Sequence, residues 1–299
     1  MNDARAARTG AAGFPPGLRL RYRLLRDGVL VGLCVVSLLL AVIPLVWVLW
    51  EVVKVGSAHI SVEFLTSLPA PPTVGGGGWA NAIVGSVVVV GIAALIGVPV
   101  GVGTGIYMSE YGNNLLGRSA RFLSEVMAGL PSIVAGIVAY GIIVVTMGRF
   151  SALSGGVALA VLFVPIVAIT TQEALQMISR DQREASFALG VAEAPTTLRV
   201  VLPAAMGNVL TGIMIATARI AGETAPLLFT AFNSRYWMEG IDQPTATIPV
   251  NIYSYAISPF EHWHNQAWAG ALVLVTAVLV LNAAARTLWA RRARFMRGE

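Results

Sequence analysis

Charged residues are scarce in this chain. They make up 12 % of its 299 residues, while hydrophobic residues make up 56 %. A soluble domain carries about 25 % charged residues, so this balance excludes an ordinary soluble protein and indicates an integral membrane protein. Cysteine is nearly absent as well. The single Cys34 lies in an apolar segment and can form neither an internal disulfide nor a multi-cysteine metal site.

Lysine and histidine are also scarce. The single lysine, Lys54, is followed by Val55, so the chain lacks the lysine with which a P-loop holds nucleotide phosphates. If ATP drives this protein, another polypeptide must bind the ATP and its Mg²⁺. The three histidines fall in predicted outer loops with too few further ligands for a metal site: His59, His262 and His264. We therefore expect no catalytic residue, metal or cofactor in this chain.

Long apolar runs dominate the remaining sequence. A bilayer core about 30 Å thick requires roughly 20 residues of helix, and isolated segments in lipid pair their backbone groups only as helices. The sequence therefore predicts an all-α polytopic membrane protein with six transmembrane helices, over residues 28–50, 82–107, 122–147, 153–175, 206–232 and 267–288.

Arginine is concentrated on one side of these spans. It occurs in the N-terminal arm, in the loops after the second and fourth spans, and in the C-terminal tail. Cytoplasmic loops carry an excess of basic residues, so both termini are predicted to be cytoplasmic (N-in/C-in), and we expect no nucleic-acid partner. The predicted organisation is a cytoplasmic arm over 1–27, disordered at its start, a membrane domain over 28–290, and a basic cytoplasmic tail over 291–299.

Small residues recur every four positions within two of the spans. Gly97, Gly101 and Gly105 do so in the second span, and Ala128, Ser132 and Gly136 in the third. Small residues at this spacing allow helix backbones to approach closely in lipid. We expect both faces to be helix-packing surfaces.

The polar stretch 184–203 separates two apolar runs. Residues 176–189 can continue as a helix, and Gly190 suits the position after a helix end. Pro195 fits the first turn of a second short helix. This pattern predicts a helical hairpin that projects into the cytoplasm over about residues 176–205.

The order of residues in this stretch resembles the EAA loop of ABC importer permeases: Glu184-Ala185-Ser186, then Gly190, then Val200-Val201-Leu202-Pro203. Ser186 stands where the family usually has Ala, and Val200 where it has Ile. The resemblance implies a coupling helix that docks on an ATPase subunit. The alternative interpretation is an ordinary amphipathic connector.

Two charged residues lie within the predicted fifth span. Arg219 is near its middle, and Glu223 follows one helical turn later. A charge at bilayer depth costs about 2.5–3.5 kcal/mol on insertion scales, so an aqueous or protein-lined pathway is the expected location. Pro226 should loosen the helix beside Glu223, a setting typical of substrate sites in transporters. The alternative is a neutral ion pair that only joins helices.

Three runs resemble the PstA-type permeases of phosphate importers: 218–228, 129–134 and 248–253. This resemblance implies the type I ABC importer permease fold, the bacterial inner membrane, and half of an ATP-driven phosphate pathway. It also implies the partners: a second, PstC-like permease, two PstB-like ATPase subunits, and an extracytoplasmic PstS-like phosphate-binding protein, with membrane lipid around the helices. Two other functions stay open, a permease for another oxyanion such as sulfate or molybdate, and an ATP-independent channel or carrier.

The expected site residues form two groups. The substrate pathway is expected to contain Arg219, Glu223, Ser132 and Thr224, and the ATPase-coupling surface Glu184, Ala185, Gly190, Leu202 and Pro203. Arginine offers paired donors to a tetrahedral oxyanion. Hydrogenphosphate retains a P–OH donor that the carboxylate of Glu223 could accept, whereas sulfate would only be repelled.

Overall fold

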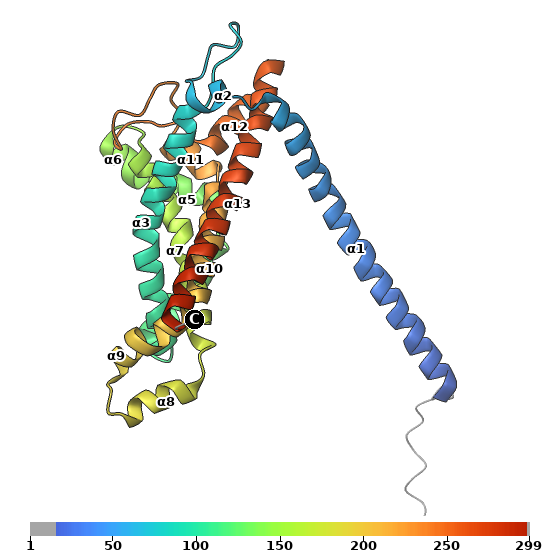
Figure 1. Cartoon of the computed structure of the whole chain (residues 1–299), viewed down its shortest axis with the longest axis vertical. Helices are drawn as coiled ribbons and strands as arrows, with labels where there is room; N and C mark the ends of the chain where they lie inside the picture. Colours follow the sequence, from blue (N-terminus) through green and yellow to red (C-terminus); the bar gives the residue numbers. More distant parts are fainter. Residues whose placement is uncertain (1–15, 298–299) are drawn as a thin grey trace, which may run out of the picture. The chain divides into compact units, whose positions relative to one another are not determined.

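The computed structural model describes residues 16–297, and no strand occurs among them. The chain divides into two compact units, residues 1–51 and 52–299. The described part of the first unit belongs entirely to helix α1 (Pro16–His59), whose last residues, from Val52 on, fall in the second unit and whose apolar span covers Arg23–His59 (Figure 1). This helix extends beyond the predicted 28–50 at both ends. The predicted disordered start of the arm falls on residues outside the described range.

Long apolar helices account for most of the second unit. They are α3 (Ala80–Glu110), α7 (Ala152–Gln176), the continuous run α9 (Glu193–Thr196), η2 (Thr197–Val201) and α10 (Leu202–Ala221), and α13 (Glu261–Arg297). Together with α1, five described helices are long and apolar enough to cross a membrane, or six if one bent pair counts as a broken span. The predicted all-α polytopic fold is therefore confirmed.

The predicted third span, 122–147, is not one straight helix. Helix α4 (Leu115–Ala128) meets the segment α5 (Ser132–Ala139), η1 (Tyr140–Val144) and α6 (Val145–Met147) at an angle of 105°. Pro131 explains the break, because it lacks a backbone N–H and disfavours the helical conformation at the preceding residue. The prediction of a continuous helix, with Ala128, Ser132 and Gly136 on one face, was wrong.

The predicted fifth span is also interrupted, here as Pro226 led us to expect. Helix α10 ends at Ala221 and the short α11 (Ala225–Thr230) follows, which leaves Glu223 in the non-helical break. Pro226 lies in the first turn of α11, where its missing N–H costs little. The predicted loosening of the helix beside Glu223 is confirmed.

The polar stretch after α7 forms a hairpin of α8 (Arg180–Ala188) and α9, which we call the α8–α9 hairpin. Figure 1 shows it at one end of the second unit, opposite α2 (Val62–Thr66) and α12 (Ile248–Ala256). Gly190 has φ +78°, which confirms the predicted position after a helix end. The predicted unbroken helix over 176–189 was wrong, because residues 177–179 form a turn.

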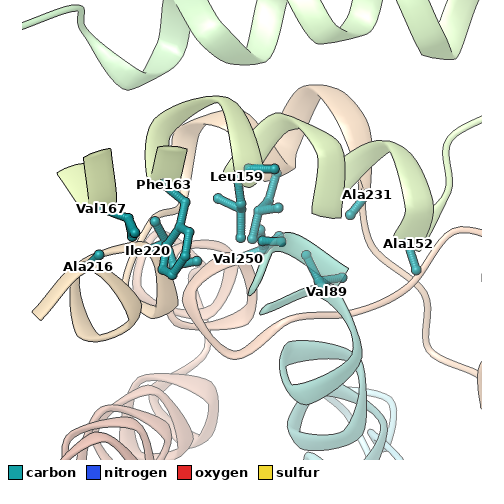
Figure 2. Close-up of a cluster of buried hydrophobic side chains, with 12 residues drawn as sticks. Val89, Ala152, Leu159, Phe163, Val167, Ala216, Ile220, Ala231 and Val250 are labelled. Atoms are coloured by element: carbon teal, nitrogen blue, oxygen red, sulfur yellow. The ribbon is translucent and has the colours of Figure 1, made fainter. Parts of the chain in front are cut away.

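Helix α7 lies at the centre of the second unit. A Cβ atom at Gly101 would lie 2.7 Å from Val167 Cβ, and one at Gly105 would lie 2.6 Å from the Ala168 carbonyl oxygen, so the α3 backbone lies directly on α7. This confirms the packing surface predicted on the second span. Close van der Waals contact is the main force available between helices in lipid. The buried cluster in Figure 2 joins α7 to α3, α10 and α12: Val89, Leu159, Phe163, Val167, Ile220 and Val250.

Candidate functional site

A cavity of ≈ 180 Å³ lies where the two interrupted helices break. Leu162 and Ile166 contribute the wall from α7, and both lie near the midpoint of that 25-residue helix. The cavity is therefore at mid-depth of an apolar span, where an aqueous site requires protein around it. The remaining lining comes from the α4–α5 break and from the end of α10: Met127, Ala128, Leu130, Pro131, Ser132, Arg219 and Glu223.

Arg219 and Glu223 share this cavity without contacting each other. Arg219 is in the last turn of α10 and is exposed, while Glu223 is half-buried in the break. Among the described residues, neither side chain has a hydrogen-bond or ion-pair partner. The i, i+4 pairing that a continuous helix would favour is lost because α10 ends at Ala221. The ion pair of the alternative interpretation is therefore not formed.

An unpaired guanidinium at this depth requires solvation or a bound anion. A water molecule occupies about 30 Å³ of liquid, so the cavity can hold several waters or one small solute. Arg219 also lies near the carbonyl end of α10, where the helix dipole favours a cation. The α10 dipole therefore stabilises the positive charge of Arg219, and the guanidinium remains free to bind an anion.

Ser132 also lines this cavity. It is the first residue of α5, and the N–H groups of a helix's first turn have no intrahelical carbonyl partner. These groups add positive potential on the Ser132 side of the cavity. Three of the four predicted pathway residues thus line one cavity, while Thr224 does not line it. The Thr224 carbonyl oxygen instead accepts from the backbone N–H of Leu227, at 3.1 Å, at the start of α11.

Close packing holds together the two segments that follow the breaks. A Cβ atom at Gly136 of α5 would lie 2.6 Å from Pro226 Cα of α11. Sequence reasoning placed a helix-packing surface at Gly136 but did not identify its partner. The meeting of the breaks beside Pro131 and Pro226 at one cavity was not predicted either: Pro226 indicated its own break, whereas the span that contains Pro131 was predicted to be continuous.

The α8–α9 hairpin exposes large apolar side chains on a polar segment. Leu189 is 84 % exposed, Phe187 and Val191 are exposed as well, and Leu198, in the adjoining η2, is 55 % exposed. Contiguous exposed apolar residues mark protein-interaction surfaces. Sequence reasoning missed these four residues; the signal was apolar residues within an otherwise polar loop.

The predicted coupling residues lie around this surface. Glu184, Ala185 and Gly190 are exposed in the hairpin, and Leu202 and Pro203 begin α10. The hairpin is closed by a buried hydrogen bond between Ser186 Oγ and Thr196 Oγ1, at 2.8 Å. The serine that departs from the EAA pattern therefore joins α8 to α9.

Comparison with known proteins gives relatives along most of the chain. Residues 97–294 match the family model described as binding-protein-dependent transport system inner membrane component. The phosphate transport system permease protein PstA of Yersinia pestis is 40 % identical over 91 % of this chain and 92 % of its own length. The probable PstA permease of Methanocaldococcus jannaschii is 36 % identical over 87 % and 92 %.

Solved structures with a similar fold are ABC transporters. A bacterial ABC transporter that imports alginate matches over 90 % of this chain and 99 % of its own, with a TM-score of 0.60 and 13 % identity. The inward-facing MetNI methionine ABC transporter matches over 70 % and 91 %, with a TM-score of 0.56 and 18 % identity. At these identities the likeness concerns the fold alone.

Proposed function

The chain belongs to the family of binding-protein-dependent transport system inner membrane components, and from this premise we propose that it is a permease subunit of an ATP-driven phosphate importer. The relatives named as phosphate permeases support this assignment. The observation that carries it is the unpaired Arg219 in a mid-depth cavity. A guanidinium stays charged at any physiological pH and binds tetrahedral oxyanions through paired N–H donors.

Phosphate suits this cavity better than sulfate because of Glu223. A carboxylate beside the guanidinium repels an anion unless that anion can donate a hydrogen bond to it. Hydrogenphosphate has a P–OH donor, whereas sulfate at neutral pH has none. In this proposal, Arg219 and the α5 N-terminus bind the unprotonated oxygens of the anion. The Glu223 carboxylate accepts a hydrogen bond from its P–OH group, so an anion without that group is disfavoured.

The α8–α9 hairpin is the proposed docking surface for an ATPase subunit. The chain has no P-loop lysine, so ATP and Mg²⁺ bind to partner subunits, with the hairpin and both termini in the cytoplasm. The helix is continuous from Glu193 through η2 to Ala221, and about 26 Å of it separate Leu202 from Arg219 at 1.5 Å per residue. A displacement of α9 by the ATPase is thereby transmitted to Arg219 along one rigid element.

The exposed position of Arg219 supports a pathway between two permeases. A single chain leaves this guanidinium open on one side, and a second, related permease would cover it and complete the pathway. Two ATPase subunits and an extracytoplasmic phosphate-binding protein complete the proposed complex.

Reconstitution of the co-expressed complex in proteoliposomes tests this function. We expect uptake of radiolabelled phosphate that requires ATP and the ATPase subunits, and that excess phosphate suppresses far more than sulfate or molybdate. Uptake that persists without the ATPase would identify a channel or carrier instead. Equal suppression by sulfate or molybdate would identify a permease for another oxyanion.

A further inference from the structure

A buried ion pair connects the α8–α9 hairpin to the end of α3. Nη1 of Arg183, in α8, lies 2.7 Å from Glu110 Oε1 and 2.8 Å from Oε2. Glu110 is the last residue of α3, and its side chain is only 7 % exposed, against 21 % for Arg183. Nη2 of the same arginine donates to the Leu175 carbonyl oxygen at 3.3 Å, in the last turn of α7. One guanidinium thus joins three helices.

This contact is strong and directional. Charge-assisted hydrogen bonds are stronger than neutral ones, and removal of one partner would leave an uncompensated buried charge. The Leu175 carbonyl lies at the end of α7 and also accepts from the backbone N–H of Ile178, at 3.3 Å. Helix α8 therefore cannot move far from the ends of α3 and α7 without breaking costly interactions.

The hairpin consequently has two arms, each connected to a different part of the cavity lining. Through Arg183, α8 is fixed to α3 and α7, which are held together along the Gly101 and Gly105 contacts, and α7 supplies the cavity wall at Ile166. The other arm, α9, is continuous with α10 and carries Arg219 to the same cavity.

We propose that Glu110 and Arg183 are positioning residues that couple the hairpin to the α7 wall of the cavity. When a partner displaces the hairpin, this ion pair makes α3 and α7 follow α8, while α9 moves α10 directly. The Ser186–Thr196 hydrogen bond keeps the two arms together, so the wall at Ile166 and the charge at Arg219 change position in one concerted step. The proposal rests on the proposed function, since it requires an ATPase that moves the hairpin.

The test uses the complete co-expressed importer with Glu110→Gln, Arg183→Gln and the double substitution. The readout is the ratio of phosphate imported to ATP hydrolysed, together with the yield of assembled complex. Coupling between two sites typically changes an equilibrium roughly 5–150-fold, so we expect each single substitution to lower the ratio at least about fivefold. Because the two groups act as one pair, the double substitution should lower it no further than the worse single one.

The control is Arg118→Gln, which removes an exposed arginine of α4, outside the hairpin, and should leave the ratio unchanged. Arg183→Lys keeps the charge with fewer donors and should assemble fully with an intermediate ratio. An unchanged ratio in Glu110→Gln and Arg183→Gln would overturn the proposal. So would a lower yield of assembled complex in Arg183→Lys with a wild-type ratio in the complex that remains, because the pair would then act on assembly alone. A wild-type complex without ATP-dependent phosphate uptake would instead refute the proposed function.

Discussion

Substitution of Arg219 by Gln should nearly abolish phosphate uptake while the fold remains intact. The Arg219 side chain has no hydrogen-bond or ion-pair partner among the described residues, so its removal leaves no protein group unsatisfied. Substitutions of this kind usually change the free energy of unfolding by less than about 0.5 kcal/mol. The stability of the permease should therefore stay close to that of the wild type.

The effect on transport should be much larger. A hydrogen bond to a charged group contributes about 1.5–3 kcal/mol, and every 1.4 kcal/mol corresponds to roughly a tenfold change in affinity. Loss of the Arg219 contact should therefore reduce phosphate uptake by about 10-fold to more than 100-fold at limiting phosphate. The measurement is initial uptake in proteoliposomes that contain equal amounts of assembled complex.

Arg149→Gln is the matched control for Arg219→Gln. Arg149 Nη2 pairs with Asp242 Oδ2 at 2.7 Å, and both side chains are about half exposed, so its loss should cost about 0.2–1 kcal/mol of stability and leave uptake normal. Near-wild-type uptake by Arg219→Gln would refute our account of the cavity. An equal loss in both variants would show that the assay reports general damage.

Three further predictions concern other parts of the molecule. Glu223→Gln should reduce the preference for phosphate over sulfate, measured by competition for uptake, because the carboxylate that repels sulfate is gone; an unchanged preference would contradict its role. Gly136→Val should lower the thermal unfolding temperature and the uptake, because the added carbons meet the Pro226 backbone and overpacking of this type costs about 1–3 kcal/mol; wild-type stability would show that α5 and α11 separate easily. Leu189→Ser should weaken ATPase binding in a pull-down assay without affecting the fold, since this side chain is 84 % exposed; full retention of the ATPase would move the docking surface elsewhere.

Local chemistry in the sequence predicted several features correctly. The length of the apolar segments predicted the long helices. Gly190 permits a positive φ and Pro226 lacks a backbone N–H, and because both effects are local, the hairpin turn and the break beside Glu223 were predictable. The close-packing surface of α3 followed from the glycine spacing, because close approach requires only the absence of side chains; its partner, α7, did not.

Features that depend on distant residues were not predictable. The hydropathy pattern gives the length of an apolar segment but not the direction of its helix. Residues 122–147 were therefore predicted as one straight span, although the helix bends by 105° after Ala128. The turn at 177–179 coincides with a contact from Arg183 to the Leu175 carbonyl, which no local pattern reveals. The cavity itself exists only because two breaks that lie far apart in the chain, at 129–131 and 222–224, come together in the fold.

Thiol labelling of Ser132→Cys tests the central claim most directly, since Arg219 stays in place and Cys34 is the only cysteine to remove. In the assembled Cys34→Ser importer, we expect a water-soluble, membrane-impermeant thiol reagent to modify residue 132, and phosphate to slow this reaction more than sulfate does. A thiol that does not react, or one that reacts at the same rate with and without phosphate, would contradict a hydrated phosphate pathway beside Arg219.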